Sequence, residues 1–174
     1  LLENILNWSR SQTGKIQIHP ENFDLHYLVN NVISLSEIQS QEKSITIENK
    51  IPENTYIFSD PNLLLTVIRN ILSNAIKFTQ RGGNIIVDLE IKDKILIKIS
   101  DNGMGMAEEV LNNLFSLNKN ISLPGTNSEK GTGLGLILCK EFVEKLGGRI
   151  WIESKLNVGT TVFIELPLSM SKIN

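Results

Sequence analysis

The stretch DPNLLLTVIRNILSNAIKFT, from Asp60 to Thr79, decides how this chain is expected to fold. It opens with Asp60 and Pro61, which is typical of a helix start, because the carboxylate accepts from the first N–H groups and proline needs no partner there. Apolar residues then recur at helical spacing, and we expect these to face the core: Leu64, Ile68, Ile71, Leu72 and Ala75. The stretch therefore predicts an amphipathic helix that ends near Phe78.

The same helix is expected to carry a narrow polar seam beside its apolar face. Asn70, Asn74 and Lys77 are spaced i, i+4 and i+7, which aligns them at about 100° per residue. Amide oxygens suit a hard cation and an ammonium suits phosphate, and Mg²⁺ takes few protein ligands beside substrate phosphates, so one Asn oxygen would suffice. A solvated polar face is the alternative, and the seam alone does not separate the two.

Shorter elements are indicated on both sides of this helix. Before it, Asp24 is expected to cap a helix with this inner face: Leu25, Leu28, Val29, Val32, Ile33 and Ile38. Strands are indicated over these stretches: 45–47, 56–58, 85–91, 95–100, 149–153 and 160–166. Two more helices are indicated, at 107–115 and 134–146. Strands and helices mix without strict alternation, which predicts one mixed sheet with helices over one face.

The two ends of the chain differ from this central part. Residues 1–13 carry apolar residues at helical spacing, typical of the tail of an amphipathic helix, and there is no initiator Met. We therefore expect a piece of a longer protein. Residues 14–23, with Pro20, are expected to be a linker, 24–168 the main domain and 169–174 a tail.

Composition limits the functions that are open to the chain. A formal net charge of −2 over 174 residues gives no electrostatic basis for a nucleic acid partner or for contact with an anionic membrane. No apolar run approaches the roughly 18 residues that cross a bilayer. Cys139 is the only cysteine, so it excludes an intrachain disulfide and is expected to be a small core residue. We expect a globular domain in a reducing compartment, namely the cytoplasmic portion of a longer protein whose membrane segment, if it has one, lies outside this chain.

A carboxylate continues the apolar face of the strand at 95–100. The three isoleucines of this strand share one face, and Asp101 has the same parity. A carboxylate at the end of a buried row costs free energy unless a donor reaches it, and an adenine amine in an apolar slot would be such a donor. The alternative is that Asp101 only caps the turn that follows. Gly103 and Gly105 would let a flat base approach the backbone.

A glycine-rich segment, Gly131-Thr132-Gly133-Leu134-Gly135-Leu136, leads into the helix at 134–146. N–H groups at a helix N-terminus bind phosphate, and glycines remove obstructing side chains. The spacing is neither the dinucleotide-binding fingerprint nor a Walker A loop, so it is weak by itself. The polar stretch 116–130 before it has no period, which is typical of a lid or a disordered loop.

In this order the features resemble the ATP-binding domain of sensor histidine kinases, within the GHKL superfamily. Residues 69–79 resemble the N box and residues 101–106 the first glycine box. Phe115 occupies the position of the F box, in a sequence that resembles this motif only loosely. Residues 131–136 resemble the second glycine box, and Gly159-Thr160-Thr161 resembles the last short Gly-Thr element.

The resemblance covers about residues 24–168 and implies both a fold and a site. The fold is a two-layer α/β sandwich of the Bergerat type, with a mixed sheet and helices on one face. The implied catalytic residues are Asn74 as Mg²⁺ ligand and Asn70 and Lys77 as phosphate contacts, while Asp101 binds the adenine amine. The 107–130 segment would be the ATP lid. Other implied ATP contacts are Gly103, Gly105, Met106, Phe115, Lys130, Gly131, Thr132, Gly133, Leu134, Gly135, Leu136 and, through water, Thr161.

The resemblance also implies partners. Residues 1–13 resemble the end of the second helix of the family's dimerisation and phosphoacceptor domain, whose histidine lies on the preceding helix and is followed by an acidic residue. His19 precedes Pro20 and His26 precedes Tyr27, so neither matches. We therefore expect transfer from ATP to a helical hairpin of the same protein or of its dimer mate. A response regulator receiver domain is expected downstream.

Two other functions remain open at this point. GHKL ATPases such as gyrase, mismatch-repair and heat-shock chaperone ATPases place a glutamate one helical turn before the Mg²⁺ asparagine. Asn70 has that position here, and an amide cannot act as a general base, which favours transfer over hydrolysis. The other alternative is a nucleotide-binding interaction module without kinase activity.

Overall fold

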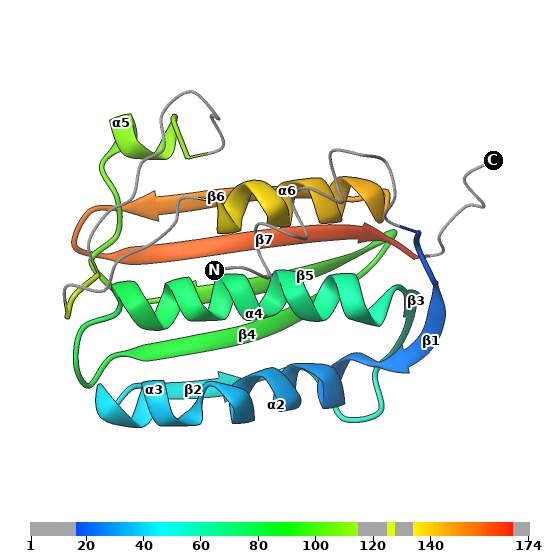
Figure 1. The fold of residues 1–174 in the computed structure, drawn as a ribbon, viewed down its shortest axis with the longest axis horizontal. Coiled ribbons are helices and arrows are strands. Elements are labelled where there is room, and N and C mark those ends of the chain that lie inside the picture. Colours follow the sequence, from blue (N-terminus) through cyan, green and yellow to red (C-terminus); the bar gives the residue numbers. More distant parts are fainter. Residues whose placement is uncertain (1–16, 115–124, 128–133, 169–174) are drawn as a thin grey trace.

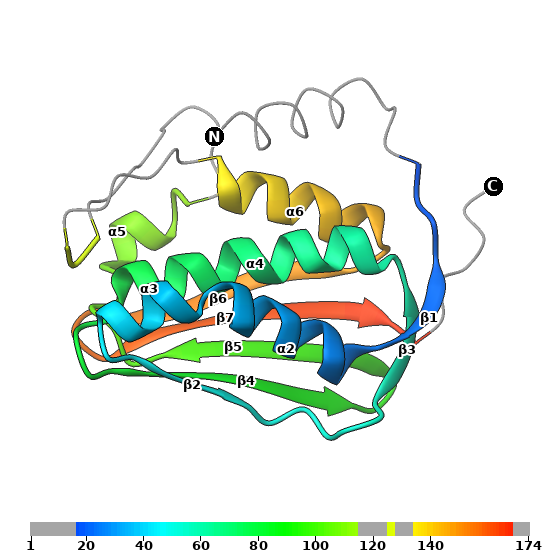
Figure 2. The ribbon, with the colours of Figure 1, turned by 60° about the horizontal axis from the view of Figure 1, so that its bottom comes forward.

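The computed structural model describes residues 17–114, 125–127 and 134–168. These residues form two layers, a sheet and a set of helices that covers one of its faces (Figures 1 and 2). The arrangement is the two-layer α/β sandwich that the sequence predicts. Its central helix is the one that begins after Asp60.

The larger sheet has five strands in the order β2-β4-β5-β7-β6. Their bounds are β2 (Thr46–Asn49), β4 (Asn84–Ile91), β5 (Lys94–Asp101), β6 (Arg149–Lys155) and β7 (Gly159–Pro167). Strand β2 runs parallel to β4, and the other neighbouring pairs are antiparallel, so the sheet is mixed as predicted. The antiparallel register runs without interruption, so side chains alternate strictly between the two faces.

The helical layer is built around α4 (Pro61–Phe78), which contacts α2 (Leu25–Leu35) and α6 (Gly135–Lys145). Asp60 caps α4 as predicted, because its carboxylate accepts from the N–H groups of Asn62 and Leu63 at 2.9 and 3.1 Å. The apolar residues that the sequence places on the inner face of α4 are all buried. No helix among the described residues is both long enough and apolar enough to cross a membrane.

Two features near the beginning of the domain differ from the sequence prediction. Ile38 is 75% exposed, not part of the inner face. The reason is that α2 ends at Leu35 and a separate helix, α3 (Glu37–Glu42), begins after Ser36, so the helical register breaks there. In addition, β1 (Glu21–Asp24) pairs with β3 (Tyr56–Ser59) as a small antiparallel sheet, although most of β1 falls in the expected linker.

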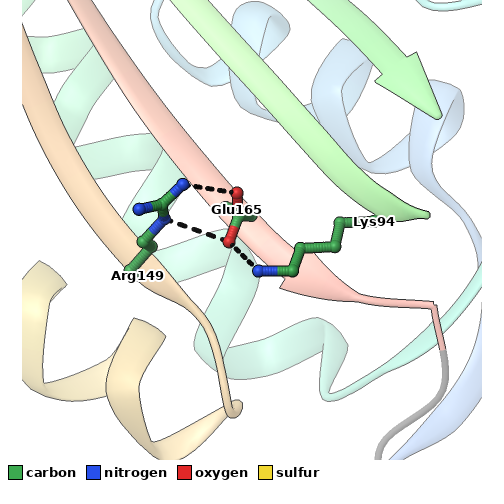
Figure 3. A network of polar contacts seen from close by, with 3 residues as sticks. All are labelled: Lys94, Arg149 and Glu165. Carbon is green, nitrogen blue, oxygen red and sulfur yellow. Dashed lines mark hydrogen bonds and ion pairs between the residues drawn. The ribbon is translucent and has the colours of Figure 1, made fainter. Parts of the chain in front are cut away.

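The face of the sheet that carries no helices bears ion pairs beside the stacked rings of Trp151 and Phe163. Figure 3 shows Glu165 of β7 between Arg149 and Lys94 of the neighbouring strands. Arg149 donates to both carboxylate oxygens at 2.9 and 3.0 Å, and the Lys94 ammonium lies 2.6 Å from Oε1. These hydrogen bonds, first from Arg149 and then from Lys94, hold the pKa of the Glu165 carboxyl below its usual range.

Candidate functional site

The polar seam predicted on α4 is present in the structure. Asn70, Asn74 and Lys77 are all half-buried, whereas Ile71, Leu72, Ala75 and Ile76 of the same turns are buried. The Lys77 ammonium lies 4.6 Å from the centroid of the Phe78 ring. The seam is therefore partly open to solvent, where a ligand can reach it.

The beginning of α6 meets this seam. The Asn70 side-chain amide donates to the carbonyl oxygen of Thr66 at 3.0 Å, which fixes how the carboxamide is turned. Its Oδ1 then lies 3.5 Å from the point where a Cβ atom on Gly135 would be. Leu134, the N-cap of α6, gives no side-chain cap hydrogen bond. A helix N-terminus attracts anions, so amide oxygens and an anion-attracting helix end lie side by side here.

Asp101 ends β5 on the helix-facing side of the sheet, in the same row as the buried Ile95, Ile97 and Ile99. Its Oδ1 accepts from the N–H group of Gly103 at 2.9 Å, so it does cap the following turn. Burial raises the pKa of this carboxyl to about 6, against the opposing effect of the backbone N–H groups of Gly103 and Thr160. Because this carboxyl remains poorly solvated although it caps the turn, it can also accept from a ligand donor.

Gly103 and Gly105 are needed by the fold itself. A Cβ atom on Gly103 would collide with the carbonyl oxygen of Phe78, at the end of α4. Gly105 has a φ of +60°, and its Cβ would collide with the carbonyl oxygen of Lys155, at the end of β6. The segment after β5 is thus packed between α4 and the β6–β7 hairpin. Close approach to the protein's own backbone explains both glycines without a bound base.

The structure places Thr161 away from Asp101. Thr161 pairs with Ser100 across β5 and β7, and their hydroxyl oxygens are 3.0 Å apart. Thr160 is the residue that pairs with Asp101. Directly paired residues in an antiparallel sheet share a face, so Thr160 lies with Asp101 and Thr161 lies on the opposite face. The period of two, which also buries Val162, would have indicated Thr160 from the sequence.

Met106 is held near this hairpin, where its N–H group donates to the Ser154 hydroxyl at 2.9 Å. Of the glycine-rich segment, Leu134, Gly135 and Leu136 are described, and they form the start of α6. The other predicted ATP contacts and the helix expected at the beginning of the chain lie outside the described residues: Phe115, Lys130, Gly131, Thr132, Gly133 and 1–13.

Two parts of the expected 107–130 lid are described: residues 107–114, where the predicted helix at 107–115 is only the short α5 (Glu108–Leu111), and residues 125–127. Thr126 lies against the end of α4, where its N–H group donates to the carbonyl oxygen of Lys77 at 3.0 Å. Its hydroxyl lies 3.2 Å from the same oxygen and 3.1 Å from the carbonyl oxygen of Thr79. This segment is therefore attached to the helix that carries the polar seam.

His26 and Cys139 have structural roles. The ring of His26 lies between the carbonyl oxygen of Ile51, 2.6 Å from Nδ1, and the side-chain amide of Asn30, 2.8 Å from Nε2. Cys139 is fully buried, which raises the pKa of its thiol to about 12, and it is a core residue as predicted. Neither group is therefore poised to react.

The two-layer α/β sandwich, with its polar seam on α4, places this protein in the Bergerat fold class. The family model described as "Histidine kinase-, DNA gyrase B-, and HSP90-like ATPase" matches residues 59–170. The chain belongs to this family of ATPase-like domains.

Individual relatives agree with this placement. The adaptive-response sensory kinase SasA of Gloeothece citriformis (strain PCC 7424) is 32% identical over 171 residues, which cover 97% of this chain and 43% of SasA. The chain thus spans less than half the length of this curated relative. The nucleotide-free catalytic domain of histidine kinase ThkA has a TM-score of 0.73 at 26% identity, covering 88% of this chain and 97% of that domain. ThkA in its complex with response regulator protein TrrA has the same fold, with a TM-score of 0.74 at 22% identity, covering 98% of this chain and 48% of ThkA.

Proposed function

We propose that this chain is the ATP-binding catalytic domain of a two-component sensor histidine kinase, which transfers the γ-phosphate of ATP to a histidine on a helical hairpin. The observation that carries the proposal is the meeting of Asn70 with Gly135. It joins the amide seam of α4 to the N-terminus of α6, so that phosphates held at one are also within reach of the other.

Kinase chemistry is favoured over ATP hydrolysis by the residue at position 70. The family's hydrolysing members have a glutamate there to orient water, whereas the Asn70 amide cannot accept a proton. Its amide N–H₂ group already donates to Thr66, which directs its oxygen toward α6. Asn70 therefore suits contact with phosphate groups and their metal ion and does not suit activation of water.

We propose Asn74 as the protein ligand of Mg²⁺. The described residues contain no group of three or more His, Cys, Asp or Glu side chains that could hold a metal. An amide oxygen together with substrate phosphates is a donor set that suits Mg²⁺, because this ion keeps most of its waters. When bound, Mg²⁺ neutralises charge on the β- and γ-phosphates during transfer. Lys77 would contact the phosphates from the same seam.

The adenine is proposed to lie against Asp101, which ends a buried row and accepts from the Gly103 N–H group through Oδ1. The water-mediated contact expected for Thr161 is transferred in this proposal to Thr160, because Thr160 shares the face of Asp101. The acceptor would be a hairpin of the same protein or its dimer mate, and a receiver domain would act downstream, as the ThkA–TrrA complex supports. The cytoplasm, where ATP is held, is the compartment proposed.

Calorimetry tests this assignment. Wild-type protein should bind ATP in the presence of Mg²⁺, and Asn74→Ala should weaken binding at least tenfold, about 1.4 kcal/mol, because it removes the proposed ligand. Asn62→Ala is the matched control, since Asn62 is exposed at the other end of the same helix and should leave affinity unchanged. Equal affinity in Asn74→Ala and Asn62→Ala would remove Asn74 from the site. No binding by wild-type protein would overturn the proposed function itself.

A further inference from the structure

The C-terminal turn of α4 is held by a lysine from another part of the chain. Lys43 follows α3 and is only 4% exposed. Its ammonium donates to the carbonyl oxygens of Ile76 and Lys77 at 2.8 and 2.9 Å. In Figures 1 and 2, α3 lies beside the end of α4 that leads to β4. The lysine thus reaches the turn that carries Lys77.

Burial strengthens the interaction between the Lys43 ammonium and the end of α4. The last carbonyl groups of a helix have no partners within the helix, and they give its C-terminus a partial negative charge. A cation there is stabilising, and the effect is largest where water does not screen it. A buried ammonium in turn costs free energy unless acceptors surround it. The Lys43 ammonium therefore supplies donors to the last carbonyl groups of α4, and these groups supply acceptors to the ammonium.

The same turn is a junction for other segments that the site needs. Thr126 donates to the carbonyl oxygen of Lys77, and the N–H group of Met104 donates to that of Phe78 at 3.0 Å. Three segments that are far apart in sequence, after α3, after β5 and at 125–127, therefore converge on the last turn of α4. The geometry of this turn determines where the Lys77 side chain starts.

We propose that Lys43 is a positioning residue for phosphate binding by Lys77. Lys43 fixes the backbone from which Lys77 extends, and its charge offsets the negative end of α4, which would otherwise repel nucleotide phosphates. The inference rests on the proposed function, in which Lys77 contacts phosphates. Loss of the Lys43 charge should weaken ligand binding more as the number of phosphates increases, because repulsion by the uncompensated helix end grows with that number. A lysine with a purely structural role would affect all ligands equally.

Titration of three ligands with two variants tests this. Lys43→Met removes the charge and keeps a similar length, and Lys50→Met is the control, because Lys50 is an exposed lysine paired with Glu48. In Lys43→Met we expect Mg²⁺–ATP affinity to fall about tenfold, ADP affinity less and adenosine affinity within about twofold. Lys50→Met should match wild type for all three ligands. Equal losses for adenosine and ATP, or none, would overturn the proposal.

Two further measurements apply if Lys43→Met does not fold. Lys43→Arg keeps the cation and should bind Mg²⁺–ATP within about threefold of wild type. In wild-type protein labelled with ¹⁵N at lysine, the Lys43 ammonium signal should shift on addition of ADP and ATP and stay unchanged with adenosine. An ammonium signal that is indifferent to phosphate would contradict the inference. Binding of ATP by wild-type protein separates these outcomes from failure of the proposed function, which would show as no binding at all.

Discussion

The carboxamide oxygen of Asn70 lies 3.5 Å from the point that a Cβ atom on Gly135 would occupy. The two residues belong to α4 and to the first turn of α6, which the periodicity within either helix does not place together. Their proximity turns two separately weak motifs, an amide seam and a glycine-rich helix start, into one candidate phosphate site.

Gly135→Ala tests this junction. A separation of 3.5 Å is ordinary van der Waals contact, and alanine is favoured over glycine in a helix, so the variant should fold with an unchanged or raised Tm. The methyl group would, however, lie between the two groups proposed to hold phosphate, and Mg²⁺–ATP affinity should fall about tenfold. Adenosine, which has no phosphate, should bind as it does to wild type. A variant that binds ATP normally would mean that phosphates do not pass between α4 and α6.

Asp101→Asn separates the capping role from the recognition role of Asp101. The amide oxygen can still accept from the N–H group of Gly103, so the turn should survive. Its N–H₂ group would oppose the adenine amine, leaving donors unpaired at about 1–3 kcal/mol, and ATP affinity should fall about tenfold or more. GTP, which has a carbonyl at that position, should lose less or gain. Calorimetry with both nucleotides decides, and equal losses would limit Asp101 to the turn.

The stability of the protein should depend on pH through the same residue. Burial raises the pKa of the Asp101 carboxyl from 3.8 to about 6. The folded protein thus holds this proton more tightly than the unfolded chain, so the favourable contribution is complete below pH 3.8 and is lost as pH rises through about 6. Asp101→Asn has no such titration. Its Tm relative to wild type should therefore rise between about pH 4 and pH 7, and a Tm difference that is constant with pH would contradict the burial of this charge.

Local patterns in the sequence predict much of this molecule. The cap at Asp60, the length of α4 and its buried face follow from residues a few positions apart, and the alternation along β5 puts Asp101 on the helix-facing side. The mixed sheet also agrees with the prediction. In each case the information lies within one element, where a period of 3.6 or 2 is visible.

The features that the sequence does not predict depend on contacts between distant segments. Gly103 is needed because the chain passes the end of α4, and Lys43 is buried because it reaches the same helix end. Pairing of β1 with β3 likewise joins residues far apart in sequence. Thr160 differs, because the alternation along β7 is visible in the sequence and places Thr160, rather than the adjacent Thr161, on the face of Asp101. Propensity and periodicity describe single elements and do not indicate which distant segments are in contact.

The chain should bind ATP without becoming phosphorylated itself. Both ring nitrogens of His26 lie within hydrogen-bond distance of Ile51 or Asn30, so its imidazole is not presented to a nucleotide. The backbone N–H group of His19 donates to the Asp60 carboxylate at 2.7 Å, which ties this residue to the other end of α4 from Lys77. Hydrolysis should also be slow, because a missing general base costs about 10²- to 10⁴-fold.

Phosphate transfer measured with labelled ATP tests the central claim most directly. The chain is incubated with Mg²⁺ and [γ-³²P]ATP, and the helical hairpin proposed as phosphoacceptor is then added as a separate polypeptide. We predict acid-labile label on the hairpin and none on the chain, with Asn74→Ala as the inactive control. Label retained on the chain at His19 or His26 would contradict the account. Rapid multiple turnover of ATP without the hairpin would also contradict it.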